Sequence, residues 1–282
     1  MDARLGLSLV GMVIGAGVLH AVWNAIAKYV DDRLVAFALM GAVSTVGGGV
    51  TVAVTGLPYR AAIGYALASA VLHLGYNAAL MNSYRLGAFN QTYPIARGTS
   101  PLVVAVGAYL IAHEHLDATA VAGVVVLALG LMSLALSSGR LTRSDLPAVG
   151  AAVLTGVAIA AYTLVDGLGV RRAHDPYAYA GLLFLLQGPA FPLVALWRRP
   201  ARVWRSATTV SRGVTAGALS LVAYGTVLWA QTKAPLAEVA ALRETSVISA
   251  ALIGTLFLHE CFGARRVGAA VLVATGIVLI SV

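Results

Sequence analysis

Apolar residues in this chain form long, nearly continuous runs that are separated by short polar connections. Each run has about the 20 residues that a helix needs to cross a bilayer. None of the runs alternates between apolar and polar residues as the strands of a membrane β-barrel do. The pattern therefore predicts an all-α integral membrane protein with ten transmembrane helices, near residues 5–28, 34–56, 61–85, 89–112, 116–138, 146–170, 177–197, 209–233, 236–258 and 264–282.

The composition agrees with a chain that lies in lipid. Of its 282 residues, 60% are hydrophobic and 11% are charged, whereas soluble domains have about 25% charged residues. The net charge is +8, and most of the Lys and Arg residues lie in the connections, as at membrane interfaces. We therefore expect the lipid bilayer as a partner and no nucleic acid. The first run leads into His20, Trp23 and Lys28 rather than into a cleavage site, which indicates a retained helix.

A repeated segment relates the two halves of the sequence. At a shift of 146 positions, "ARGTSPLVVAVGAYLIAHE" (96–114) aligns with "LRETSVISAALIGTLFLHE" (242–260). Seven of these nineteen pairs are identical, and one of them pairs Arg97 with Arg243. The repeat divides the predicted helices into two sets of five, over residues 1–140 and 141–282. Because five is odd, the second set is expected to be inverted in the membrane, as in transporters that bind substrate between inverted repeats.

Three stretches carry a resemblance to a known family: "LHAVWNAIAK" (19–28), "YPIARGTSPL" (93–102) and "AALRETSVISAALIGTLFLHE" (240–260). The chain resembles ten-helix permeases of the drug/metabolite transporter superfamily that are built from two EamA domains. The resemblance implies a central cavity lined by helices one, three, four, six, eight and nine, and both termini in the cytoplasm of a bacterial inner membrane. The fourth and ninth helices end in "HEHL" and "HECF" instead of the Gly-Glu-Arg that the family often has.

Arg97 and Arg243 stand inside apolar runs at matching positions. Arg in the middle of a bilayer costs about 2.5–3.5 kcal/mol on insertion scales, so such residues usually face a cavity or one another. A guanidinium keeps its charge and forms forked bonds with carboxylate or phosphate. One interpretation is therefore a cavity for an anionic or zwitterionic substrate. The other is that each side chain lies near a helix end and reaches the interface, as Arg97 would if its helix began at Pro94.

Glu244 has no acidic counterpart in the first half, where Gly98 occupies the matching position. Two interpretations stay open for this carboxylate. It forms an ion pair with Arg97 or Arg243, or it stands in the cavity as a proton site.

The first helix carries a polar and aromatic stripe where a lipid-facing helix would carry Leu and Val. His20, Trp23, Asn24 and Lys28 share one face at spacings of three and four. We predict that His20, Trp23 and Asn24 line the cavity, and that Lys28 is an anchor at the interface.

Further candidates come from the third, fourth, sixth and eighth helices. Tyr162 and Asp166 share one face of the sixth helix; we predict a cavity position for Tyr162 and an interfacial anchor at Asp166. Aromatic residues either wall the cavity or belong to the interfacial belts. The full set of predicted substrate-binding residues is Arg97, Arg243, Glu244, Trp23, Asn24, His20, Tyr93, Ser100, Ser246, Tyr76, Tyr162 and Tyr224.

These features favour a secondary transporter of a small metabolite, as a monomer or homodimer. No nucleotide-binding G-x-x-x-x-G-K motif is present, so energy would come from an ion gradient or from exchange. A flippase of a lipid-linked group is one alternative, and an intramembrane enzyme is another. The sequence predicts no catalytic residues, no cofactor and no metal site, because "HEH" at 113–115 lacks the His-Glu-x-x-His spacing. The distribution of Lys and Arg favours termini outside, against the family resemblance, so orientation stays open.

Overall fold

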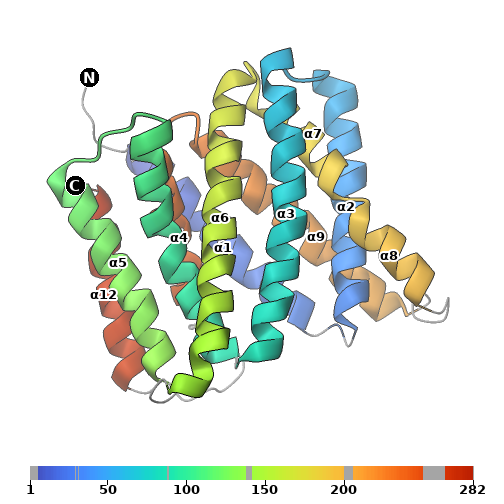
Figure 1. The fold of residues 1–282 in the computed structure, drawn as a ribbon. Coiled ribbons are helices and arrows are strands. Elements are labelled where there is room, and N and C mark those ends of the chain that lie inside the picture. Colours follow the sequence, from blue (N-terminus) through green and yellow to red (C-terminus); the bar gives the residue numbers. More distant parts are fainter. Residues whose placement is uncertain are drawn as a thin grey trace.

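The computed structural model describes residues 6–281 apart from 29, 31, 88, 138–141, 200–205 and 250–263. Every regular element in this part of the chain is a helix, which confirms the predicted all-α fold. The elements, shown in Figure 1, are α1 (Leu7–Lys28), α2 (Arg33–Thr55), α3 (Arg60–Leu86), α4 (Phe89–Ile111), α5 (Ala118–Ser137), the 3-10 turn η1 (Arg143–Asp145), α6 (Leu146–Arg172), α7 (Pro176–Gln187), α8 (Ala190–Arg198), α9 (Ala207–Ala230), α10 (Leu236–Arg243) and α12 (Ala264–Ser281).

Eight segments of the described chain are long and apolar enough to span a bilayer, and they match the first eight predicted helices. α7 and α8 together form one of these spans. A turn at Gly188 and Pro189 separates them within the span that the sequence predicts over 177–197. The ninth predicted helix is represented by α10 and a helical stretch over 245–249, and its remainder lies outside the described residues. α12 corresponds to the tenth, with a shorter apolar helical part.

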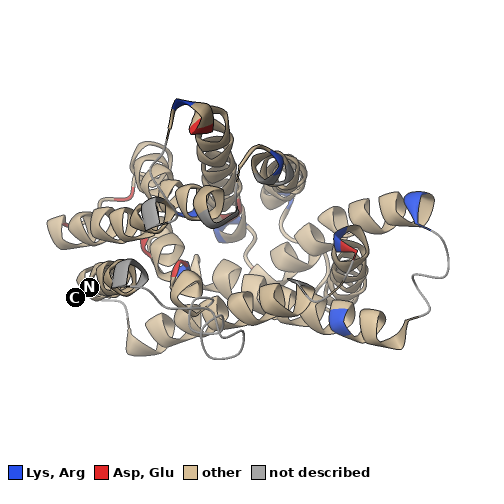
Figure 2. Ribbon diagram, turned by 90° about the horizontal axis from the view of Figure 1, so that it is seen from below, with Lys and Arg blue, Asp and Glu red and all other residues tan. Residues whose placement is uncertain are grey.

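The outer surface of the bundle is apolar, as lipid contact requires. On α2, Val46, Val50 and Val54 follow one another at four-residue intervals and are 67%, 59% and 80% exposed. A spacing of four places side chains on one face of a helix, so these valines form a stripe that points away from the bundle. Figure 2 shows that charged positions are sparse over the ribbon, which is mostly uncharged. The protein is therefore a multi-pass membrane protein.

Local signals fix several helix ends. Asp32 caps α2 by accepting hydrogen bonds from the backbone nitrogens of Leu34 at 2.9 Å and Val35 at 3.3 Å. Gly56, with φ 79°, ends the same helix in a conformation that glycine adopts without strain. Before α5, the backbone N–H of Ala120 and the hydroxyl of Thr119 both donate to Asp117. These hydrogen bonds hold the pKa of Asp117 below its usual value.

Helices from the two halves of the sequence pack against each other throughout the bundle. α5 lies along α12 at one edge, while α2 packs on α7 and α8 at the other edge (Figure 1). Between these edges α6 packs on both α3 and α4, and α1 packs on α9. The repeat therefore does not fold into two separate units, and residues from both halves meet in the middle.

Glycine makes the contact between α2 and α7 possible. A Cβ atom built on Gly48 would lie 2.5 Å from the backbone nitrogen of Leu185 and 2.6 Å from the carbonyl oxygen of Gly181. These are backbone atoms, so they cannot turn away as a flexible side chain can. Small residues allow this kind of close approach between membrane helices, where packing rather than the hydrophobic effect drives association.

We expect the variant Gly48→Ala to unfold at a lower temperature than the wild type, because its methyl group forces α2 and α7 apart. Overpacking of this kind costs about 1–3 kcal/mol. Gly49→Ala is the matched control, since the nearest atom to its added Cβ is a Leu185 side-chain carbon at 3.8 Å. Melting of the detergent-solubilised proteins measures both effects. Equal melting temperatures for the two variants would contradict the predicted close contact.

Candidate functional site

Arg97 lies deep inside the bundle. α4 begins at Phe89, so Arg97 is about two turns into the helix rather than in its first turn. The residue is 4% exposed. Its Nη2 atom donates a hydrogen bond of 2.7 Å to the hydroxyl of Ser246. The side chain therefore turns toward the second half of the chain and not toward the membrane interface.

The structure also gives Arg97 an acidic partner. Its Nε atom lies 2.6 Å from Oε2 of Glu244, and the exposed fractions of the two side chains are 5% and 0%. The Nε–H bond points away from the ideal direction, and neither oxygen of Glu244 accepts a well-aligned hydrogen bond among the described residues. Arg97 and Glu244 thus form a buried ion pair that is close but incompletely hydrogen-bonded.

Arg243 occupies the end of α10, where the helix is interrupted. Glu244 forms a turn, and helical structure resumes over 245–249. Arg243 is 4% exposed, and within the described structure its Nε and Nη2 atoms have no hydrogen-bond partner. It interacts electrostatically with Tyr162, Arg97, Glu244 and Tyr224. Two arginines and one glutamate therefore leave an excess of positive charge in the interior.

α1 packs directly against this interruption through a glycine. A Cβ atom built on Gly17 would lie 3.2 Å from the backbone nitrogen of Ser246 and 3.5 Å from the carbonyl oxygen of Arg243. On the same helix, His20 interacts electrostatically with both Arg97 and Arg243. The predicted polar stripe of α1 thus lies beside the arginines over at least one turn.

Aromatic rings surround the positive charges. Tyr162 on α6 stacks on His73 of α3 with 4.1 Å between ring centroids. Tyr76 and Tyr224 meet the same tyrosine edge-on at 5.5 Å and 6.3 Å. Tyr93 lies on α4, with its ring centroid 5.8 Å from Cζ of Arg97. Rings and hydroxyl groups from four helices therefore meet at one region of the bundle.

The structure places the remaining predicted residues less uniformly. Trp23 packs edge-on against His20 at 4.9 Å, and its buried Nε1 lacks an acceptor among the described residues. Ser100 is fully buried, and its hydroxyl has no described hydrogen-bond partner. Asn24 is exposed and donates to the carbonyl oxygen of His20, without a described contact to either arginine. The side chain of Lys28 lies outside what the structure describes.

The position of Asp166 differs from the one predicted from the sequence. We expected an anchor at the membrane interface, but the residue is fully buried. The hydroxyl of Tyr179 donates to Oδ1 at 2.9 Å, and that of Tyr224 donates to Oδ2 at 2.5 Å. The sequence did contain a signal, because Asp166 shares a helix face with Tyr162.

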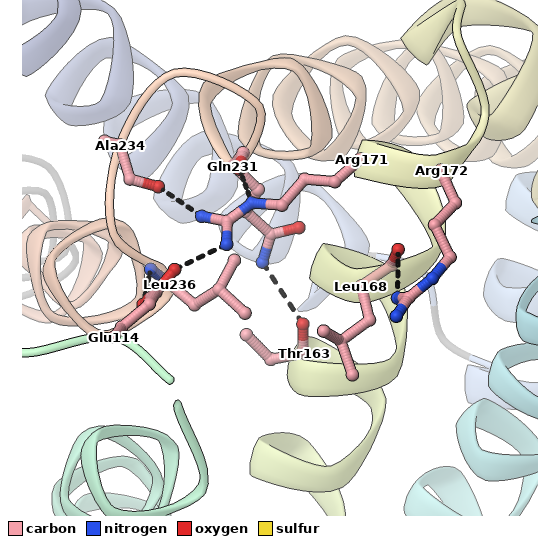
Figure 3. Close-up of polar contacts among 8 residues, drawn as sticks. All are labelled: Glu114, Thr163, Leu168, Arg171, Arg172, Gln231, Ala234 and Leu236. Atoms are coloured by element: carbon pink, nitrogen blue, oxygen red, sulfur yellow. Dashed lines mark hydrogen bonds and ion pairs between the residues drawn. The ribbon is translucent and has the colours of Figure 1, made fainter. Parts of the chain in front are cut away.

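A second polar cluster, missed by sequence reasoning, joins both halves at one end of the bundle (Figure 3). Arg171 pairs with Glu114, whose other oxygen accepts a hydrogen bond from the backbone nitrogen of Leu236 at 2.7 Å. The guanidinium also donates to the carbonyl oxygens of Gln231 and Ala234, both at 2.7 Å. This cluster ties the ends of α4 and α6 to the loop before α10, which in turn leads to Arg243.

A cavity of about 490 Å³ lies near this cluster and is separate from the buried arginines. Its lining includes Arg171, His174, Trp229 and Lys233. Trp229 therefore contributes to a cavity at the end of α9. Arg97 and Arg243 themselves are enclosed in this conformation.

Comparison with known proteins agrees with this architecture. A crystal structure described only as "Crystal structure of protein" superposes on the chain with a TM-score of 0.74 and 14% sequence identity, over 97% of both chains. At that identity the similarity shows a shared fold. No curated protein sequence matches the chain.

The fold and its apolar surface define a multi-pass α-helical membrane protein. Residues 146–282 match the EamA-like transporter family, so the second half of the chain is similar to that family. Members of this family are membrane transporters of the drug/metabolite type rather than enzymes. The resemblance that "AALRETSVISAALIGTLFLHE" (240–260) carries is thereby confirmed, and so is the broad prediction of a transporter.

The ion pair of Arg97 with Glu244 predicts how substitutions change the stability of the protein. In Arg97→Gln, the carboxylate of Glu244 stays buried without its partner, which costs about 3–5 kcal/mol. We expect this variant to melt at a clearly lower temperature, and the double variant Arg97→Gln with Glu244→Gln to recover most of the loss. Arg243→Gln serves as the control, because it leaves the ion pair intact. If Arg243→Gln destabilised as much as Arg97→Gln, Glu244 would depend on both arginines.

Proposed function

We propose that the protein is a secondary transporter that carries a small anionic or zwitterionic metabolite across a bacterial inner membrane by alternating access. The observation that carries this proposal is the buried pair Arg97 and Arg243, beside which Glu244 is the one carboxylate that interacts with both among the described residues. Glu244 pairs with Arg97. Nε and Nη2 of Arg243 have no hydrogen-bond partner in the part of the chain that the structure describes, and a substrate carboxylate or phosphate would supply the acceptors.

A buried guanidinium without hydrogen-bond partners is costly, so the site favours a bound acceptor. Buried polar groups in native proteins are nearly always hydrogen-bonded, and the exceptions call for an explanation. An anion bound between the two arginines would neutralise the excess positive charge, and it would also accept hydrogen bonds from Arg243. A forked bond from Arg243 would also orient a planar carboxylate.

The helix contacts support an arrangement of two inverted five-helix repeats, over residues 1–140 and 141–282. In that arrangement α1 corresponds to α6, α2 to α7 with α8, α3 to α9, α4 to α10 with its continuation, and α5 to α12. The contacts then occur in matched pairs: α3 on α6 corresponds to α9 on α1, and α2 on α9 corresponds to α7 on α3. α5 on α12 and α2 on α7 each join an element to its own counterpart.

Inverted repeats supply the alternating access that this proposal needs. Two halves of one fold can exchange conformations, so that a site between them faces first one side and then the other. Arg97 and Arg243 lie at equivalent positions of the sequence repeat, and both face the middle of the bundle. We propose that the transporter acts as a monomer or homodimer and draws its energy from an ion gradient or from exchange.

Substrate class is tested by ligand-induced stabilisation of the purified protein. A ligand that binds only the native state raises the melting temperature, and the rise grows with the logarithm of the ligand concentration once this exceeds Kd. We expect small carboxylates or phosphates to raise it, and amines without an acidic group to leave it unchanged. Stabilisation by cationic amines alone would overturn the proposed charge preference.

Variants of Arg243 test the site itself, with the most effective acid from that screen as the probe. Arg243→Lys keeps the charge but loses the fork, so binding should weaken about tenfold or more, as expected for a charged hydrogen bond. Arg243→Gln should weaken it further. The matched control is Arg172→Gln, because Arg172 is exposed at the end of α6 and bonds to its own helix.

Uptake of the same acid into liposomes completes the test. Wild-type protein should transport it, and the Arg243 variants should lose transport while still folding. Binding and transport unchanged in Arg243→Gln would exclude Arg243 as a substrate ligand. Movement of lipid headgroups instead of the free acid would identify a flippase.

A further inference from the structure

Four helices converge on one buried carboxylate that the proposed substrate site does not use. Asp166 lies on α6 and is 0% exposed. Tyr179 on α7 and Tyr224 on α9 donate to its two oxygens at 2.9 Å and 2.5 Å. His73 and Ser69, both on α3, interact with it from the third side. Each of these helices therefore contributes a group that faces the carboxylate.

Hydroxyl groups are the only described hydrogen-bond partners of this carboxylate. None of the ion pairs in the described chain involves Asp166. Those pairs are Arg97 with Glu244, Arg171 with Glu114 and Arg199 with Asp32. A carboxylate without a cationic partner in a membrane interior is costly, and such residues mark ion and proton pathways. Binding of one proton would remove the charge without moving any helix.

His73 adds a second proton-binding atom to the cluster. Its Nδ1 atom lies 2.9 Å from the backbone carbonyl oxygen of Ser69, which can only accept, so Nδ1 carries a proton. In the neutral ring Nε2 is then the nitrogen without a proton. This nitrogen is the atom of His73 that can accept a proton, and the ring interacts electrostatically with Asp166.

The donors favour a proton over a metal ion at this position. A metal ion in an oxygen site takes several lone pairs from carboxylates, carbonyls or water. Here both oxygens of Asp166 already accept O–H bonds from tyrosines. No group of three His, Cys, Asp or Glu residues that could hold a metal ion occurs in the described part of the chain.

Tyr224 connects this cluster to the arginines. Its hydroxyl donates to Asp166, and the same residue interacts electrostatically with Arg243. Tyr162, on the same helix as Asp166, also interacts with Arg243 and stacks on His73. α4 packs on α6 as well and brings Arg97 and Tyr93, which both interact electrostatically with Tyr162.

We propose that Asp166, together with His73, is the proton-binding site of this transporter, and that Tyr224 couples it to the anion site. This inference rests on the proposed function for its role in transport. When a proton binds to Oδ2 of Asp166, the new O–H group donates to Tyr224 instead of accepting from it. The hydroxyl of Tyr224 is then free to donate to an anion held by Arg243, so the proton and the anion favour each other's binding.

Infrared difference spectroscopy of the purified protein tests the site with the proton itself as the probe. A protonated carboxyl group has a C=O stretch that is separate from the amide bands. Spectra of the wild type are compared between mildly acidic and mildly alkaline pH. We expect a carboxyl band that disappears reversibly as the pH rises and that is missing from Asp166→Asn. Glu244→Gln is the control, because it removes another buried carboxylate and should keep this band.

A second variant keeps the test valid if Asp166→Asn does not fold. Tyr179→Phe retains Asp166 but removes one donor, and it should shift the midpoint of the band's titration. A wild-type band that is unchanged in Asp166→Asn, or a midpoint unaffected by Tyr179→Phe, would overturn the proposal. So would a wild-type spectrum without a pH-dependent carboxyl band, since Asp166 would then not exchange a proton in this range.

The readout needs no substrate, so the two proposals fail independently. If no acid binds to the protein but the Asp166 band titrates, the anion site is wrong and the proton site stands. Where an acid does bind, its affinity should rise at the pH at which Asp166 is protonated, and Tyr224→Phe should abolish this dependence. Persistence of the dependence in Tyr224→Phe would remove the coupling role of Tyr224.

Discussion

The contact of Arg97 with Glu244 and Ser246 is the constraint on which the middle of this structure depends. A guanidinium that is 4% exposed in a membrane protein needs partners, and the contact that α4 itself supplies is the ring of Tyr93, which cannot neutralise the charge. Both partners come from the segment that follows α10. The need to neutralise one arginine therefore fixes α4 against the second half of the chain. The same contact holds the turn at Glu244 in place, and the turn fixes the position of the neighbouring Arg243 at the end of α10.

Backbone features adapt the helices to this contact. Pro101 cannot donate to the carbonyl of Arg97, so α4 lacks one internal hydrogen bond at the arginine. α10 stops at Arg243 and helical structure resumes over 245–249. Discontinuous helices with irregular backbone are tolerated inside membrane proteins where they adjoin a binding site. At the end of the bundle, Arg171 and Glu114 hold the loop that leads into α10 (Figure 3), so the position of the interruption is determined from both sides.

Much of this arrangement could be predicted from the sequence, and the failures have physical causes. The apolar runs predict the helices, because few other structures can span a bilayer. They did not predict the break at Gly188 and Pro189. There α2 approaches the broken backbone: a Cβ atom on Gly41 would lie 2.5 Å from the carbonyl oxygen of Gly188 and 2.9 Å from Pro192. The partner of Glu244 stayed open because neighbouring residues of a helix point about 100° apart, and only the turn at Glu244 decides it. Asp166 was misplaced because its two tyrosines lie 13 and 58 positions away in the chain.

The excess of positive charge follows from an asymmetry between the two halves. Gly98 stands at the repeat position of Glu244, and it packs tightly on α5. A Cβ atom there would lie 2.9 Å from a side-chain carbon of Met132 and 3.1 Å from the carbonyl oxygen of Ala128. The first half thus has no space for a second carboxylate beside its arginine, whereas the turn after α10 gives Glu244 the space it needs. Among the described residues, the one carboxylate beside the two arginines pairs with Arg97, and Arg243 is left with N–H groups for which a bound anion would be the partner.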